Sequence, residues 1–228
     1  MSTPSPLKAH LGIAAREYDE RIRTFVPFYE EMVGAAAAVF EVLAPERPTV
    51  VDLGIGTGAL AERCLALRPG ASVVGVDQDA SMLALARARL ARFGQVELRQ
   101  GSFLETPVAP CDVIVACLAL HHVPDPERKQ ALYRRCREAL SAGGRMILAD
   151  CYLPSDPSLR EAGFTRWRAH LAERYGQAGA EAHLAAWAHE DTYFPLADEA
   201  SWLQEADFPV DVAWRRDLFA VLVCGPRR

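Results

Sequence analysis

The hydrophobic pattern of the chain alternates between two periods. Short runs rich in β-branched residues predict buried strands, whereas longer segments in which apolar side chains recur every three or four positions predict helices. Five strands are expected at residues 49–53, 72–77, 95–99, 111–117 and 145–149. Helices are expected after the first, second and fourth strands, ending at Pro69-Gly70, at Gly94 and at Gly143-Gly144. This alternation is typical of an α/β protein with a parallel sheet.

Both ends of the chain depart from this alternation. Residues 8–44 have a helical period, with a break expected near Pro27. Residues 152–206 are rich in aromatic side chains and helical in period, and we expect no strand among them. The last two apolar runs, 208–214 and 218–224, are separated by only three residues. Because no helix fits between them, we predict that they form an antiparallel hairpin.

The composition is that of a one-domain globular protein. Half of the 228 residues are hydrophobic and 24% are charged. The net charge of −5 argues against a protein that coats nucleic acid through bulk electrostatics. The richest apolar stretch, residues 32–43, is short and contains Gly34 and Glu41, so we expect no membrane span. The N-terminus has no basic region followed by an apolar core and does not resemble a secretory signal.

The cysteines and arginines add two further expectations. No two of the six cysteines form a Cys-x-x-Cys pair, and most stand in apolar runs, so we expect free thiols and a cytoplasmic location. Two basic runs, Arg134-Arg135-Cys136-Arg137 and Arg87-Ala88-Arg89, fall on the outer faces of predicted helices. We expect them to be solvated surface rather than an RNA-binding patch.

A glycine-rich turn, Gly54-Ile-Gly-Thr-Gly58, joins the first strand to the first helix of the sheet. Glycines at such a turn let the backbone bend sharply and let a ligand approach closely. Asp77 ends the second strand, where an acidic residue commonly accepts hydrogen bonds from both hydroxyls of a ribose. Together these features predict a nucleoside-binding site.

Two other interpretations of the turn remain open. The glycines could simply pack a helix on the sheet. Alternatively, Gly54-x-Gly56-x-x-Ala59 satisfies the relaxed pattern of nicotinamide-dependent oxidoreductases. Asp52 argues against the second, because its charge suits a ligand's ammonium group and would lie awkwardly near a pyrophosphate. The helices before the turn and the antiparallel hairpin argue against it too.

Four segments resemble motifs of the class I S-adenosylmethionine-dependent methyltransferases. Val-Val-Asp-Leu-Gly-Ile-Gly-Thr-Gly (50–58) is similar to their first motif and Val-Val-Gly-Val-Asp-Gln-Asp-Ala-Ser-Met (73–82) to their second. Residues 111–125 resemble the fourth-strand motif and residues 140–148 the fifth. The final hairpin matches the reversed seventh strand of the family, so the resemblance covers most of the chain.

The resemblance implies an α/β fold: a Rossmann-like, seven-stranded mixed sheet with an antiparallel C-terminal hairpin. We divide this single domain into an N-terminal helical cap (1–46), a cofactor-binding core (47–151), a helical lid insertion before the hairpin (152–206) and the hairpin itself (207–228).

The resemblance also implies roles for individual residues toward the cofactor, S-adenosyl-L-methionine. Asp52, Gly54 and Gly56 would serve its methionine end. Asp77 would bind the ribose, with Gln78 and Met82 along the adenine. The adenine contacts of the family also imply Ser102 and Phe103, although many members have an acid where this chain has Ser102. Leu118 would flank the sulfonium.

The ends of the chain are also similar to the carboxy-S-adenosylmethionine synthase branch of this family, which modifies the cofactor for a tRNA pathway. The N-terminal similarity lies in residues 18–23 and 26–29, and the C-terminal similarity in residues 202–206 and 218–224. The branch usually lacks the His121-His122 pair that this chain carries. That difference favours ordinary methyl transfer.

His121 and His122 stand at the tip of the fourth strand, where the acceptor would lie in an open α/β sheet. Either could serve as a general base when the acceptor must lose a proton, or both could be structural. We expect no metal site, because two adjacent histidines need further ligands and the neighbouring sequence offers no His-x-x-x-His or carboxylate cluster.

The two helical end segments supply further candidate contacts. Tyr18 could face the sulfonium and Arg23 a carboxylate, or both could belong to the packing and the solvated face of a helix. Six aromatic residues in the second segment could line a pocket for an apolar or aromatic acceptor, but we expect most of them to form the core of a lid. They are Phe164, Trp167, Tyr175, Trp187, Tyr193 and Phe194.

The sequence thus predicts an enzyme that transfers a methyl group from S-adenosylmethionine to a small-molecule substrate. The alternatives are a carboxy-S-adenosylmethionine synthase-like enzyme, a cofactor-binding protein without turnover and, more distantly, a nicotinamide enzyme. A homodimer is left open.

Overall fold

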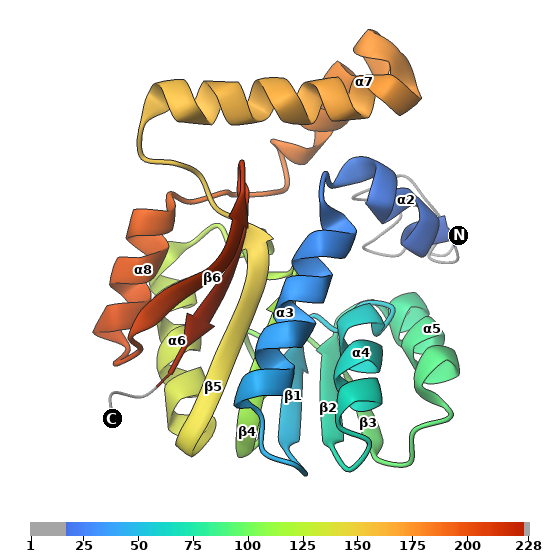
Figure 1. Cartoon of the computed structure of the whole chain (residues 1–228), viewed down its shortest axis with the longest axis vertical. Coiled ribbons are helices and arrows are strands. Elements are labelled where there is room, and N and C mark those ends of the chain that lie inside the picture. The colour runs from blue at the N-terminus through green and yellow to red at the C-terminus, as the bar shows by residue number, and fades with distance from the viewer. Residues whose placement is uncertain (1–16, 226–228) are drawn as a thin grey trace.

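Seven strands form one sheet at the centre of the computed structural model, which describes residues 17–225 (Figure 1). The strands are β1 (Thr49–Leu53), β2 (Ser72–Asp77), β3 (Val96–Gln100), β4 (Cys111–Cys117), β5 (Leu140–Cys151), β6 (Val210–Arg216) and β7 (Phe219–Cys224). Their order is β3-β2-β1-β4-β5-β7-β6. The pairs from β3 to β5 are parallel, and β7 runs antiparallel to both β5 and β6. The predicted mixed sheet and hairpin are confirmed.

The strand order changes direction between β1 and β4. From β1 the chain adds β2 and β3 on one side, and it then returns to add β4 and β5 on the other. In an open parallel sheet such a reversal leaves a crevice beyond the carboxyl ends of the central strands, because the connections leave in opposite directions. The fold therefore places the end of β1 and the end of β4 beside the same opening.

Helices cover both faces of the sheet (Figure 1). One face packs against α3 (Tyr29–Leu43), α4 (Ala59–Leu67) and α5 (Ala80–Leu90). The other packs against α6 (Pro126–Ala139) and α8 (Leu196–Glu205). Each face buries its own apolar cluster, as expected for parallel strands that are hydrophobic on both sides.

The predicted segment 152–206 contains two helices in different positions. α7 (Pro157–Trp187) lies across the carboxyl ends of the strands, and Gly176, with φ of 69°, divides it into two helical pieces (Figure 1). α8 instead buries Leu203 in the sheet's second cluster, so it belongs to a covering layer of the sheet. An isolated β-bridge, Leu153–Pro195, joins the chain before α7 to the chain between α7 and α8.

The N-terminal segment breaks where the sequence predicts. α2 (Tyr18–Phe25) ends before Pro27, and Phe28, with φ of 62°, begins the turn into α3. The part of the predicted helical cap that falls on residues 1–16 lies outside the described residues.

The helix predicted for residues 126–140, with Gly143-Gly144 as its termination signal, ends at Ala139, but the strand predicted to begin at residue 145 begins five residues earlier. Leu140 is already extended and pairs with Cys111, so β5 begins there and contains both glycines. The reason is a close approach of the two strands: a Cβ on Gly144 would lie 3.0 Å from the carbonyl oxygen of Asp112. These glycines therefore fit a strand irregularity rather than a helix terminus.

Within residues 17–225, no helix combines the length and apolar character needed to cross a membrane. The six cysteines are unpaired, and all but Cys117 are buried.

A buried polar contact joins the two helices on the second face. The Lys129 ammonium group of α6 pairs with the Glu199 carboxylate of α8, and both residues are at most 2% exposed. The hydroxyl of Tyr133 donates to the other oxygen of Glu199 at 2.6 Å. Removing one partner of such a pair leaves an uncompensated buried charge, which costs far more than losing a surface ion pair.

We predict that Lys129→Met lowers the free energy of unfolding by about 3–5 kcal/mol. Urea denaturation would measure the change, with Arg128→Met, on the exposed side of the same helix, as a control that shifts it by less than about 0.5 kcal/mol. The double variant Lys129→Met/Glu199→Gln should recover at least half of the loss, since it removes the stranded charge and retains an acceptor for Tyr133. A Lys129→Met protein as stable as the control would contradict this assignment.

Candidate active site

A cavity of about 400 Å³ lies at the carboxyl edge of the sheet. Twelve of the thirteen residues that the sequence proposes for the site line it. They are Tyr18, Asp52, Gly54, Gly56, Asp77, Gln78, Met82, Ser102, Phe103, Leu118, His121 and His122. The cavity thus brings together residues from α2 and from the ends of β1, β2 and β4.

The glycine turn is shaped by backbone hydrogen bonds to β2. The N–H groups of Gly54 and Ile55 donate to the carbonyl of Val76 at 2.8 and 3.0 Å. Gly54 has φ of 74°, and a Cβ there would lie 2.6 Å from that of Ala119. Gly56 also has positive φ, but a Cβ there would meet nothing within 4 Å. Gly54 is therefore needed for the fold of the turn, whereas Gly56 leaves open space beside the cavity.

Asp77 connects the turn with the start of α5. One of its carboxylate oxygens accepts a hydrogen bond from the Gly56 N–H at 2.8 Å, and the other accepts one from the Asp79 N–H at 2.9 Å. Burial raises the pKa of Asp77, and these two N–H groups partly oppose the rise. The carboxyl group is thus held at the edge of the cavity with a fixed orientation.

Asp52 is the most unusual acid of the site. It is 2% exposed, and no cation or hydrogen-bond donor among residues 17–225 contacts its carboxyl group. Burial, together with the charge of Asp77, raises its pKa from 3.8 to about 8. An ammonium group entering the cavity would stabilise the ionised form of this acid.

The residues proposed to contact the adenine ring of the cofactor lie next to Asp77 along the cavity wall. Gln78, Met82, Ser102 and Phe103 all line the cavity. The Ser102 hydroxyl accepts a hydrogen bond from the Leu104 N–H at 3.2 Å, so part of its hydrogen-bonding capacity serves its own turn.

Leu118, the first residue after β4, adopts φ of 51°, a left-handed conformation that is rare for leucine. Its N–H donates to the Ala149 carbonyl at 2.8 Å, which holds the strained backbone in place. Such strain costs about 1–3 kcal/mol and is concentrated at functional sites. Here it redirects the chain at the cavity wall, just before the histidines.

Two arginines behave differently from what the sequence predicts. Arg23 does not line the cavity; its side chain is 49% exposed and pairs with Glu30 at 2.6 Å, so its expected contact with a ligand carboxylate is not supported. Arg89, expected on the solvated face, is mostly buried. It pairs with Asp19 of α2 and donates to the Thr57 hydroxyl at 2.8 Å. Arg89, which belongs to α5, therefore links α2 to the glycine turn through Asp19 and Thr57.

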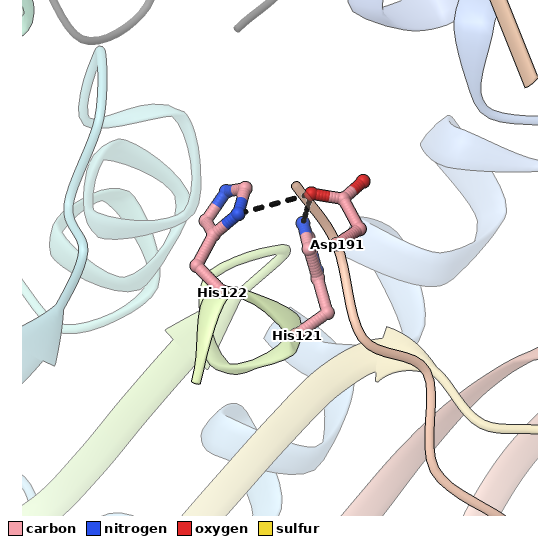
Figure 2. Close-up of side chains that lie close together, drawn as sticks. All are labelled: His121, His122 and Asp191. Atoms are coloured by element: carbon pink, nitrogen blue, oxygen red, sulfur yellow. Dashed lines mark ion pairs between the residues drawn. The ribbon is translucent and has the colours of Figure 1, made fainter. Parts of the chain in front are cut away.

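His121 and His122 form a short 3-10 helix, η2 (Leu120–His122), beyond β4. Figure 2 shows a nitrogen of each ring directed at the carboxylate of Asp191. The His122 Nδ1 lies 3.1 Å from the Asp191 Oδ1, and the His121 Nε2 lies 3.8 Å from the same oxygen. The side chain of Asp191 is 4% exposed, and the Tyr193 hydroxyl donates to its other oxygen at 2.6 Å.

Asp150, near the end of β5, fixes the orientation of His121. Its Oδ1 lies 2.6 Å from the His121 Nδ1, and its Oδ2 accepts hydrogen bonds from the backbone N–H groups of Leu120 and His121. Since Nδ1 is engaged by Asp150, the Nε2 of His121 is the atom that faces Asp191.

The electrostatic effects in this group reinforce one another. Burial alone would lower the pKa of His121, but the charge and hydrogen bond of Asp150 outweigh it, and the pKa is raised overall. Burial alone would raise the pKa values of Asp150 and Asp191, but the histidines hold both below their usual range.

Aromatic side chains close the cavity above the histidines. Trp167 and Trp187 of α7 are at most 5% exposed, and both line the cavity. The Trp167 indole N–H donates to the Phe25 carbonyl at 2.7 Å and so joins α7 to α2. The ring of Trp167 also lies edge-on to Phe219 at 5.0 Å. The two tryptophans therefore have two roles: they form part of the buried core beneath α7, and they line the cavity.

The sequence interpretation missed Asp150 and Asp191. Asp150 carries a usable signal, because it directly follows the predicted strand at residues 145–149 and so stands at a strand end, as Asp77 does. Asp191 carries none, since 69 positions separate it from His122 and only the path of α7 brings them together. The sequence argument considered only ligands within reach along the chain, whereas the fold brings the carboxylate of Asp191 beside the histidine pair.

Comparison with known proteins agrees with this geometry. Residues 50–144 match the sequence model of a methyltransferase domain. An uncharacterized methyltransferase of Geobacillus kaustophilus is 28% identical over 151 residues, covering 65% of this chain and 68% of that protein. A carboxy-S-adenosyl-L-methionine synthase of Campylobacter jejuni is 25% identical over 197 residues, covering 85% of this chain and 83% of that protein.

A solved structure described as a DhpI–SAH complex has the same fold. It superposes with a TM-score of 0.65 at 22% identity, covering 99% of this chain and 100% of that chain. A second complex of that protein, with SAM and HEP, gives a TM-score of 0.66. The matched domain and the relatives indicate an S-adenosylmethionine-dependent methyltransferase, and the strand order is that of a Rossmann-like methyltransferase fold. The domain match and the structural neighbours solved with SAH and SAM support S-adenosylmethionine as its cofactor.

The raised pKa of Asp52 leads to a prediction about cofactor binding. Below about pH 8 the free protein holds a proton on Asp52, whereas a complex with an ammonium group beside it favours the carboxylate. Binding should therefore release a proton, and affinity should rise with pH up to about 8, by at most about tenfold per unit.

Calorimetry of S-adenosylhomocysteine binding at pH 6.5, in buffers with different ionisation enthalpies, would measure this proton release. We expect close to one proton per site in the wild type and much less in Asp52→Asn. The exposed acid Asp211 provides a matched control, since Asp211→Asn should leave the release unchanged. Equal release in wild type and Asp52→Asn would contradict the role given to Asp52.

Proposed function

We propose that the protein transfers the methyl group of S-adenosylmethionine to a small-molecule acceptor, with the cofactor in the cavity at the carboxyl edge of the sheet. The observation that carries the proposal is the buried, uncompensated Asp52 carboxyl group beside the glycine turn, with Asp77 on the same wall. These acids complement a ligand with a cationic ammonium and sulfonium. A nicotinamide cofactor offers no ammonium group to Asp52, and its pyrophosphate would disfavour ionisation of this buried acid.

The arrangement of the walls supports one orientation of the cofactor. Its ribose would bind Asp77 and its adenine would extend along Gln78, Met82 and Phe103. The amino group of its methionine part would face Asp52. This leaves the methyl group directed toward Leu118 and the histidines, in the half of the cavity that α7 covers.

His121 and His122 are the residues we propose to act on the acceptor. Methyl transfer is an in-line displacement, so most of the acceleration comes from alignment of acceptor and methyl group in a site that excludes water. When the acceptor is a hydroxyl or an amine, a group that helps to remove its proton increases the rate further. Trp167 and Trp187 favour an acceptor with an apolar or aromatic body.

A second candidate function is formation of a carboxylated S-adenosylmethionine. It is favoured by the similarity to the Campylobacter enzyme, which extends over 85% of this chain. That activity requires a carboxylic acid co-substrate, and Arg23, the cation proposed for such a group, pairs with Glu30 outside the cavity. Mass analysis of the nucleoside product separates the two, because methyl transfer leaves S-adenosylhomocysteine.

Two further expectations extend this proposal. We propose a cytoplasmic location, since the six cysteines are free thiols. Homodimer formation remains a prediction that size measurement in solution can test.

The cofactor assignment predicts that Asp77→Ala weakens S-adenosylhomocysteine binding by about 1.5–3 kcal/mol, the usual cost of losing charge-assisted hydrogen bonds to the ribose. Calorimetry would measure this, and NAD should show no comparable binding to the wild type. Asp211→Ala serves as the control, and thermal denaturation would verify that Asp77→Ala is folded. Wild-type affinity in folded Asp77→Ala would exclude the ribose contact.

The acceptor assignment predicts that His121→Ala or His122→Ala lowers kcat by about a hundredfold or more while S-adenosylhomocysteine affinity stays near that of the wild type. Turnover would be followed as S-adenosylhomocysteine release with acceptors from a panel of small aromatic hydroxyl compounds. The exposed His189 offers a matched control, because His189→Ala changes a histidine of the same covering region outside the cavity. If both single variants keep turnover within a few-fold of wild type, the pair is structural.

A further inference from the structure

Three potential metal ligands converge at the acceptor end of the cavity (Figure 2). One nitrogen of His121, one nitrogen of His122 and one carboxylate oxygen of Asp191 all lie within 4.8 Å of one another. The histidines come from the tip of β4 and Asp191 from the segment after α7, so the fold assembles the group from distant parts of the chain.

The distances are close to those of a coordination sphere. A divalent ion bonds imidazole nitrogen and carboxylate oxygen at about 2.0–2.2 Å, which places neighbouring ligand atoms roughly 3.0–3.5 Å apart. The His122 Nδ1 and the Asp191 Oδ1 are 3.1 Å apart. The His121 Nε2 is 3.8 Å from the same oxygen, so a small rotation of the Asp191 side chain would complete the arrangement.

The surrounding contacts also match those of a metal site. Histidines that bind metals usually donate their other ring N–H to a carboxylate, and ligating carboxylates are in turn hydrogen-bonded. Asp150 holds the His121 Nδ1 at 2.6 Å, which presents Nε2 to the cluster. The Tyr193 hydroxyl holds the second oxygen of Asp191 at 2.6 Å, which presents the first. Two of the three ligands are thus oriented by groups that do not compete for the ion.

The ligand set selects a class of ion. Magnesium and calcium prefer oxygen ligands, whereas imidazole suits the divalent ions of the first transition row and zinc. Two histidines and one carboxylate leave at least one coordination position open, as catalytic zinc sites do. Since the three residues line the cavity, that position faces the space where the acceptor would lie.

We propose that His121, His122 and Asp191 bind a divalent transition-metal ion of the zinc type, and that its open position receives an oxygen of the acceptor. The metal-binding part stands on the geometry alone, whereas the acceptor part rests on the proposed methyl transfer. A hydroxyl bound to the ion loses its proton to solvent more readily. Its oxygen then forms the bond to the methyl group while the bond between methyl and sulfur breaks, releasing S-adenosylhomocysteine.

The experiment uses the full chain without an affinity tag, dialysed against a chelator and titrated with Co²⁺ and Zn²⁺ by calorimetry, with Mg²⁺ for comparison. We expect one Co²⁺ per chain, a visible absorption band from the bound Co²⁺, displacement of Co²⁺ by Zn²⁺, and no comparable binding of Mg²⁺. Asp150→Asn should weaken Co²⁺ binding by about 10–100-fold, and His122→Ala and Asp191→Asn by more.

His189→Ala, two positions from Asp191 and exposed, should bind Co²⁺ as the wild type does. Unchanged affinity for S-adenosylhomocysteine would show that each variant is folded. Absence of saturable Co²⁺ and Zn²⁺ binding, or equal binding in wild type, His122→Ala and Asp191→Asn, would overturn the proposal and leave the cluster as a hydrogen-bonded network.

The two proposals can fail separately. Site-specific Co²⁺ binding without methyl transfer to any acceptor would support the metal site and count against the acceptor role. Methyl transfer that is undiminished after chelator treatment would overturn the acceptor role even if Co²⁺ binds.

Discussion

The reversal of strand order between β1 and β4 is the constraint on which the rest of this structure depends. Parallel strands end at the same edge, and at the reversal the connections after β1 and β4 leave in opposite directions. The glycine turn and the histidine pair are therefore neighbours in space although more than sixty positions separate them along the chain. The covering segments α2 and α7 then convert this open edge into a cavity.

The two halves of the cavity differ in their chemistry. Around the glycine turn the walls are acidic, and the buried Asp52 has no positive partner among residues 17–225, which suits a cationic cofactor. Around η2 the walls combine two tryptophans with His121, His122 and Asp191, and Asp150, which does not line the cavity, bonds to His121. Methyl transfer from one half to the other suits this separation. The cationic cofactor is stabilised by acidic groups, whereas the acceptor needs an apolar wall and groups that can act on its proton.

The division between what the sequence predicts and what it misses has a physical basis. Local sequence is enough to predict the strands, the glycine turn and the position of Asp77. The strands follow from the period of apolar residues, and the turn follows from glycines at positions where the backbone bends sharply. Arg89 with Asp19, Lys129 with Glu199, and His122 with Asp191 are contacts between elements distant in sequence. No spacing rule relates such partners, so only the assembled fold reveals that Arg89 pairs with Asp19 and that a carboxylate lies beside the histidines.

A crystal structure of the protein with S-adenosylhomocysteine tests the central claim most directly. The account predicts the ribose hydroxyls on the Asp77 carboxylate, the amino group beside Asp52, and the sulfur directed toward Leu118 and the histidine pair. A ligand bound elsewhere, or one whose sulfur points away from His121 and His122, would contradict the assignment of the two halves of the cavity.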